Sequence, residues 1–131
     1  MRYMLLIYTR ETEDGPSPEE VASLKAAYWE VIDDAARKGV LLGAEPLART
    51  ATATTVRIDN GRVLITDGPF AETKEQLAGY YMLDCENLDE AIEWAARIPA
   101  GSKGREGSVE IRPMPGLPPR SEARAPATRN G

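Results

Sequence analysis

The sequence TDGPFAETKEQLAGYY, residues 66–81, is the stretch around which the chain is organised. It leaves one predicted β-strand through a Gly-Pro turn, crosses a charged segment and enters a second predicted strand with two adjacent tyrosines. Glycine and proline favour such a turn because glycine tolerates positive φ and proline fixes its own φ. The stretch should therefore bring a set of charged and aromatic side chains near one sheet edge: Asp67, Phe70, Glu72, Lys74, Tyr80 and Tyr81.

A long amphipathic helix is predicted upstream of this stretch. Ser17 is the expected N-cap, Pro18 occupies the first helical position, and Glu20 can complete a capping box. Gly39 ends the helix, in keeping with the usual place of glycine just past a helix C-terminus. Apolar side chains recur at helical spacing between these ends: Val21, Leu24, Tyr28, Val31 and Ala35.

Apolar and alternating segments predict the strands. Residues 2–8 are apolar on both faces, which is typical of a central strand. Asn60-Gly61 is a two-residue hairpin signal, because both turn positions need positive φ. Asn87 is the expected cap of a second helix that ends at Pro99, with Glu90 as its capping-box partner. The further predicted strands are residues 40–47, 54–59, 62–66, 78–85 and 108–114.

This order of elements predicts an α+β fold. The two helices are far apart in the sequence, which excludes a doubly wound α/β sheet. We expect one mixed or antiparallel sheet, formed by residues 1–114, with two helices on one face. Because two helices cover only one face, the other is expected to meet a partner's sheet in a homodimer. Residues 115–131 form a proline- and arginine-containing tail, expected to be mobile or ordered only against a neighbour.

Composition and charge exclude several classes of function. The net charge of the chain is −5. The tail has a net charge of +2, so residues 1–114 have a net charge of −7. This negative charge argues against a nucleic-acid partner. The sequence has no histidine and one cysteine, so we expect no metal site, no cofactor and no internal disulfide. Apolar runs are too short to cross a membrane, and the cysteine usage predicts a cytoplasmic protein. Cys85 is expected to be a buried apolar residue rather than a reactive thiol.

Residues 67–81 contain the first candidate site residues. Asp67 is expected either to cap backbone N–H groups in its turn or to act as a general base or ligand acceptor. Glu72 belongs either to a solvated charged turn or to a carboxylate pair with Asp67. Tyr80 and Tyr81 point to opposite faces of a strand, so one belongs to the core or a dimer seam and the other is expected to line a cavity, with Phe70 nearby.

The last predicted strand adds a charged pair. Glu110 and Arg112 lie two positions apart, so both side chains project from the same face. They could pair with each other or across a dimer, and an ion pair at the interface is the favoured interpretation. The alternative is that Arg112 binds an anionic ligand.

The sequence also resembles a known family. Asp67-Gly68-Pro69-Phe70 and the six residues that follow are similar to the DGPF branch of the YCII-related family, and the resemblance covers residues 1–114. It implies a ferredoxin-like subunit of a dimeric α+β barrel. A histidine–aspartate pair is suspected in the wider family, but here the first helix reads Ala26-Ala27-Tyr28-Trp29 where a histidine is expected. Further matching segments are residues 2–8, 53–57, 79–81, 88–91, 94–99 and 107–113.

Two functions follow from these observations. The first is a small-molecule cavity beside residues 67–70 with cofactor-free acid–base chemistry, in which Asp67 is the base, Glu72 or a tyrosine assists, and Arg112 fixes an anionic group. The second is a non-catalytic regulatory or protein-interaction module. Members of the DGPF branch resemble neighbours or partners of sigma factors, which implies a link to regulation or stress. The sequence leaves open whether the protein is an enzyme.

Overall fold

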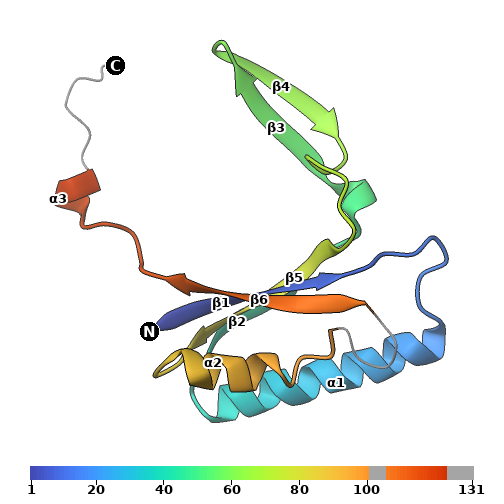
Figure 1. Ribbon diagram of the computed structural model, residues 1–131, viewed down its shortest axis with the longest axis vertical. Helices are drawn as coiled ribbons and strands as arrows, with labels where there is room; N and C mark the ends of the chain where they lie inside the picture. Colours follow the sequence, from blue (N-terminus) through green and yellow to red (C-terminus); the bar gives the residue numbers. More distant parts are fainter. Residues whose placement is uncertain (101–105, 124–131) are drawn as a thin grey trace.

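The chain forms a four-stranded antiparallel sheet with two helices packed against one face (Figure 1). The computed structural model describes residues 1–100 and 106–123. The strands lie in the order β2-β5-β1-β6, so that β1 and β5 are central. The elements of this layer are β1 (Arg2–Thr9), α1 (Pro18–Arg37), β2 (Leu41–Pro46), β5 (Gln76–Asp84), α2 (Leu88–Ala95) and β6 (Gly107–Met114).

The topology is that of a ferredoxin-like α+β domain. Two β-α-β units, β1-α1-β2 and β5-α2-β6, interleave their strands in one sheet, and every strand pair in it is antiparallel. The predicted fold class is therefore confirmed.

A hairpin is inserted between β2 and β5. It consists of β3 (Thr54–Asp59) and β4 (Arg62–Asp67), preceded by the short 3₁₀ helix η1 (Thr50–Thr52), and we call β3 and β4 together the arm. The predicted turn is confirmed, with φ of 52° at Asn60 and 78° at Gly61. The sequence predicts one sheet for all the strands, whereas the arm forms a separate two-stranded sheet. Its strands pair with each other and extend away from the helices (Figure 1).

Both helices begin at the predicted caps. The Ser17 hydroxyl accepts from the Glu20 amide at 3.1 Å, and the Glu20 carboxylate accepts from the Ser17 amide at 3.4 Å, which completes the capping box of α1. In α2 the Asn87 side chain accepts from the Glu90 amide at 3.0 Å. The Glu90 carboxylate accepts from the Glu86 amide at 3.3 Å, one residue before the predicted partner.

The second helix is shorter than predicted. It ends at Ala95, and the residues that follow form tighter turns rather than further helix. The amide of Arg97 bonds the carbonyl of Trp94, and that of Ile98 bonds Ala95, each only three residues back. A turn of this kind is common where an α-helix ends.

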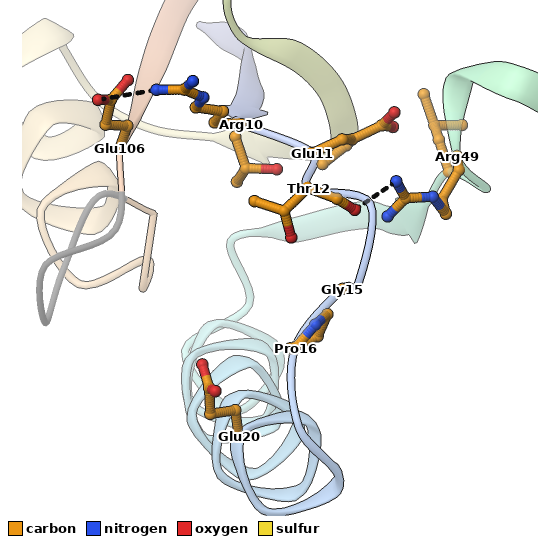
Figure 2. A pocket seen from close by; sticks show the side chains of 11 residues that line it. Arg10, Glu11, Thr12, Gly15, Pro16, Glu20, Arg49 and Glu106 are labelled. Atoms are coloured by element: carbon orange, nitrogen blue, oxygen red, sulfur yellow. Dashed lines mark hydrogen bonds and ion pairs between the residues drawn. The ribbon is translucent and has the colours of Figure 1, made fainter.

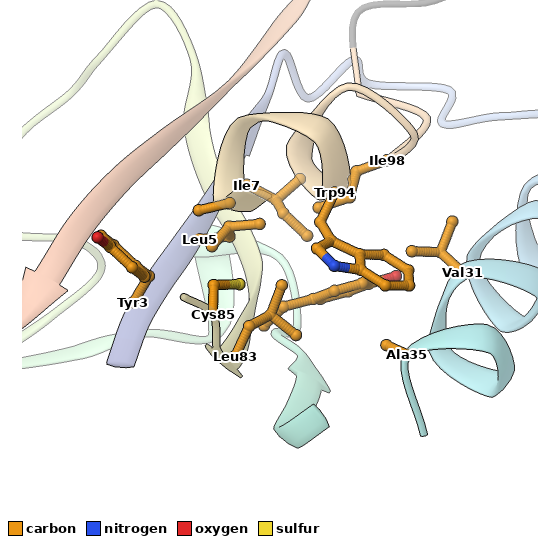
Figure 3. Packing of buried hydrophobic residues seen from close by; sticks show 11 residues of the cluster. Tyr3, Leu5, Ile7, Val31, Ala35, Leu83, Cys85, Trp94 and Ile98 are labelled. Carbon is orange, nitrogen blue, oxygen red and sulfur yellow. The ribbon is translucent and has the colours of Figure 1, made fainter. Parts of the chain in front are cut away.

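The hydrophobic core lies between the helices and one face of the sheet (Figure 3). Alternate residues of β1 are buried, as expected of a strand with a period of two. Cys85 is 2% exposed, and burial, followed by the nearby Glu90 carboxylate, raises its pKa to about 11, which confirms the buried thiol. The buried side chains are Tyr3, Leu5, Ile7, Val31, Ala35, Tyr81, Leu83, Cys85, Ala91, Trp94 and Ile98.

The other face of the sheet is covered by no helix of the described residues. We call it the open face; its central side chains are half-buried and come from β1 and β5: Met4, Leu6, Tyr8, Tyr80 and Met82. Glu110 and Arg112 of β6 pair with Leu6 and Met4 across the sheet and so lie on the same face.

The segment after β6 leaves the sheet. Residues 115–119 have no helix or strand, and a short helix α3 (Arg120–Ala123) follows. The expectation for the end of the tail, residues 124–131, lies outside the described residues. Within the described residues no helix combines the length and apolarity that a membrane span requires.

Candidate functional site

An apolar cleft of about 520 Å³ lies between α1 and the edge of the sheet formed by β2. We call it the α1–β2 cleft. One wall is the middle of α1, from Leu24 to Ile32, and the other is β2 together with the nearby ends of β1 and β5. Its size falls in the range of small-molecule sites. It is lined by Ile7, Thr9, Leu24, Tyr28, Trp29, Ile32, Leu41, Ala44, Glu45, Pro46, Ala78 and Tyr81.

The cleft exists because α1 packs closely on the sheet at one end only. Val31 and Ala35, toward the C-terminus of α1, are buried, whereas Val21 near its start is 48% exposed. Leu24 and Tyr28, which lie on the same apolar stripe, are half-buried and line the cleft. The predicted stripe therefore serves two purposes: Val31 and Ala35 fill the core, and Leu24 and Tyr28 in the middle of the helix form a cleft wall.

A polar cavity of about 550 Å³ adjoins this cleft at the end of β1 (Figure 2). Both are lined by Thr9 and Ala78, so the two spaces are neighbours, and we call the polar one the mouth. Charged side chains from three separate segments surround it: Arg10, Glu11, Glu20, Arg49 and Glu106.

Glu11 holds the mouth together. Its carboxylate accepts from the Thr50 hydroxyl at 2.7 Å and from the Thr50 amide at 3.0 Å, while its own amide donates to the Gln76 side chain at 2.8 Å. These bonds fasten the loop after β1 to the base of the arm and to the start of β5. Glu11 is thus committed to structure, since two donors already occupy its carboxylate.

The two arginines of the mouth differ in their partners. Arg10 forms an ion pair with Glu106 at 3.4 Å, and Lys74 approaches the same carboxylate at 3.8 Å. Arg49 donates to the carbonyl oxygen of Thr12 at 2.7 Å, which is a neutral acceptor (Figure 2). The charge of Arg49 is therefore the one best placed to meet an anionic group of a ligand.

A buried tyrosine forms part of the cleft floor. Tyr81 is 3% exposed, and its hydroxyl donates to the carbonyl of Tyr28 at 3.4 Å. Burial, with a smaller effect of Tyr28, raises the Tyr81 pKa well above its usual range. Tyr81 therefore stays protonated at neutral pH and suits packing and hydrogen bonding rather than proton transfer.

The structure separates most of the residues that the sequence singled out. Tyr81 lines the α1–β2 cleft, and Tyr80 lies on the open face, as their opposite directions predict. Asp67, Phe70 and Glu72 are exposed at the base of the arm. Arg112 is on the open face. The cleft and the mouth are therefore lined by none of the following candidates: Asp67, Phe70, Glu72, Tyr80 and Arg112.

The turn after Asp67 is held by its backbone and by Thr55. The Gly68 amide donates to the carbonyl of Ala53 at 2.7 Å, and the Thr55 hydroxyl donates to the carbonyl of Gly68 at 2.8 Å. Gly68 adopts φ of 98°, which a residue with a Cβ rarely does. Among the hydrogen bonds of the described residues none uses the Asp67 carboxylate, so the expected side-chain cap is replaced by these bonds.

The charged pair on β6 is present. Arg112 lies 3.7 Å from Glu110, and the Tyr8 hydroxyl donates to the other oxygen of Glu110 at 3.3 Å. Partial burial and the Glu110 charge raise the Tyr8 pKa. The two residues therefore pair with each other within one chain, while an ion pair at a dimer interface stays a prediction.

Sequence reasoning missed the residues that make the mouth and most of those that line the cleft. Arg10 and Glu11 follow an apolar strand, and Arg49 follows the proline that ends β2, but no local pattern shows that these segments meet. Trp29 lines the cleft although it lies outside the apolar stripe of α1, and it is 53% exposed. In the described part of the chain no group of three or more histidine, cysteine or acidic side chains is arranged to hold a metal ion.

The fold and the cleft define a ferredoxin-like α+β protein with a small-molecule-sized space beside its first helix. The chain belongs to the YCII-related domain family, whose family model matches residues 1–115. It is similar to an uncharacterized protein of Rhizobium meliloti (strain 1021), with 34% identity over 122 residues. That match spans 87% of this chain and 92% of the relative.

Proposed function

We propose that this protein binds a small amphipathic molecule, with an apolar body in the α1–β2 cleft and an anionic group at Arg49. The observation that supports this most strongly is that the two spaces adjoin: an apolar cleft shares Thr9 and Ala78 with a charged mouth. Ligand sites of this kind combine apolar walls with a few polar groups that fix orientation.

Binding without chemistry is the form of this proposal that the side chains favour. The carboxylate of Glu11 is occupied by Thr50, and the hydroxyl of Tyr81 donates to a carbonyl. Acid–base chemistry by Asp67 and Glu72 would need a ligand held beside residues 67–72, which line neither the cleft nor the mouth. The predicted catalytic roles of these two carboxylates remain a separate hypothesis.

We also propose that the protein is a cytoplasmic homodimer that belongs to the DGPF branch. The support for the dimer is the open face, whose apolar side chains are only half-buried in the single chain. The support for the branch is the sequence of residues 67–76. The net charge of −5 favours neither nucleic acid nor an anionic membrane surface as a partner.

The ligand proposal is tested with decanoate as the probe and 1-decanol as its neutral counterpart. Trp29 lies at the cleft, so we expect decanoate to shift its fluorescence, and the Trp29→Phe variant should lose that signal. Arg49→Gln should weaken decanoate binding about tenfold, because a charge-assisted hydrogen bond is lost, and should leave decanol binding nearly unchanged.

Arg62→Gln is the matched control, since Arg62 lies at the tip of the arm and lines neither the cleft nor the mouth. Equal loss of affinity in Arg49→Gln and Arg62→Gln would show a general charge effect rather than a site at the mouth. A Trp29 signal that never responds to either probe would remove the proposal.

A further inference from the structure

The arm has one apolar face that no described part of the chain covers. Cross-strand pairing places Val56 opposite Ile65 and Ile58 opposite Val63, so these four β-branched side chains share one face of the hairpin. They are 59–73% exposed. The opposite face pairs Thr55 with Thr66 and Arg57 with Leu64, and is largely polar.

Such a pattern is typical of a strand pair with one side on a hydrophobic core. An isolated two-stranded hairpin is marginally stable in water, and it needs a third strand or a packing surface to be stable by itself. A contiguous exposed apolar patch on a folded domain marks an interaction site. The alternation along β3 and β4 therefore indicates that something packs on the face formed by Val56, Ile58, Val63 and Ile65.

We propose that this face packs on a second copy of the chain, so that each arm clasps the other subunit of the dimer. The inference rests on the proposed homodimer and goes beyond it, because it assigns an interface role to a segment that lies outside the sheet. In a two-fold dimer the arm of each subunit packs on the other subunit in the same way. One symmetric contact therefore covers the apolar faces of both arms.

The size of the interface supports this occupant. The outline of the four-stranded sheet, with strands of 6–9 residues spaced about 4.8 Å apart, covers about 500 Å² on its open face. The outline of the arm adds about 200 Å² by the same geometry, so a contact that includes the arm is about two-fifths larger than one through the open face alone. Stable interfaces bury about 800 Å² of accessible surface on each partner, which favours the larger contact.

The position and charge of the arm agree with this occupant. The arm extends on the side of the sheet away from α1 and α2, which is the side where the open face lies (Figure 1). Its two arginines and two aspartates, Arg57, Arg62, Asp59 and Asp67, sum to zero charge in a chain of net charge −5. Two acidic copies repel each other, so a neutral apolar segment is suited to contact between them.

The test measures the dimer dissociation constant by analytical ultracentrifugation for the full chain and two variants. Ile58→Thr/Ile65→Thr keeps β-branched side chains and so preserves the hairpin, while it removes apolar area from the proposed interface. We expect this double variant to raise the dissociation constant at least about tenfold. Leu64→Thr, on the opposite face of the arm, is the matched control and should change it by less than about threefold.

Hydrogen exchange of residues 54–67 gives a second readout. Amides of the arm should exchange more slowly at protein concentrations above the dimer midpoint than below it. A dimer whose affinity is the same in both variants, with arm exchange independent of concentration, overturns the arm proposal and leaves the dimer through the open face standing. A chain that stays monomeric at every concentration overturns both.

Discussion

Asp34 is the residue that fixes where α1 meets the rest of the domain. Its carboxylate lies 2.6 Å from the Arg97 guanidinium, 3.2 Å from that of Arg37 and 3.3 Å from the Lys38 ammonium. Arg97 and Lys38 also lie over the ring of Trp94, at 4.8 and 5.5 Å from its centroid. These contacts hold the C-terminal end of α1 against the end of α2, while the other end of α1 diverges to form the cleft.

The charge cluster predicts an acid-sensitive contribution to stability. The hydrogen bond from Arg97, together with Lys38, lowers the Asp34 pKa to about 2. A depressed folded-state pKa stabilises the fold above the unfolded value of about 3.9, and this stability is lost as the pH falls toward 2. The difference in unfolding free energy between wild type and Asp34→Asn, measured in urea, should therefore be largest above about pH 4, small near pH 2 and absent below it.

The exposed carboxylate of Asp33, next to Asp34 in the sequence, supplies the control for these unfolding measurements. Asp33→Asn removes a charge from the same helix without removing any of these three ion pairs. Its effect on unfolding should be smaller than that of Asp34→Asn. An Asp34→Asn difference that stays constant from pH 2 to pH 6 would contradict the assigned role of the cluster.

At the scale of elements, the contact between β2 and β5 positions one wall of the cleft. Gly79 of β5 faces the backbone of β2, and a Cβ at Gly79 would lie 2.8 Å from the carbonyl oxygen of Glu45 and 3.2 Å from the Cα of Pro46. Backbone atoms cannot turn away as a side chain does. The close approach of β2 therefore depends on glycine at this position.

Gly79→Ala should destabilise the fold by about 1–3 kcal/mol, because overpacking against backbone forces β2 to shift. The same shift moves Ala44 and Pro46, which line the cleft, so decanoate affinity should fall as well. Gly43→Ala is the matched control. Its added Cβ would meet only the terminal methyl of Met82, at 2.9 Å, which can rotate aside. Equal losses of stability in both variants, measured by urea unfolding, would argue against the backbone contact.

Much of the element-level structure was predictable because its causes are local. Ser17 and Asn87 cap their helices by bonds to residues three positions on, and Asn60-Gly61 turns a hairpin with its own backbone. The separation of the arm from the main sheet was not predictable. Strand patterns are the same whether a hairpin joins a sheet or stands beside it, and only the path of residues 47–53 decides between the two.

At the scale of the whole molecule, the candidate site depends on contacts between distant segments. Arg10, Arg49 and Glu106 meet at the mouth although they come from three separate parts of the chain. The cleft itself results from the divergence of α1 from β2, and the apolar stripe of α1 does not reveal where the helix leaves the sheet. The sequence placed Tyr81 in the core or beside a cavity, and it lies at the border of both.

The arrangement gives the molecule two separate surfaces for two proposed tasks. The α1–β2 cleft and its mouth are on the helix side and the end of β1, whereas the open face and the arm lie on the other side of the sheet. Glu11 connects them, since it bonds Thr50 at the base of the arm while it lines the mouth.

The most direct test of the central claim is an NMR titration of the ¹⁵N-labelled protein with decanoate, followed amide by amide. Binding in the cleft predicts the largest shift changes at Tyr28, Ala44 and Ala78, with Arg49→Gln reducing them at equal ligand concentration. Changes confined to Leu6 and Met82 on the open face, or no changes at saturating decanoate, would contradict the assignment of the α1–β2 cleft as the binding site.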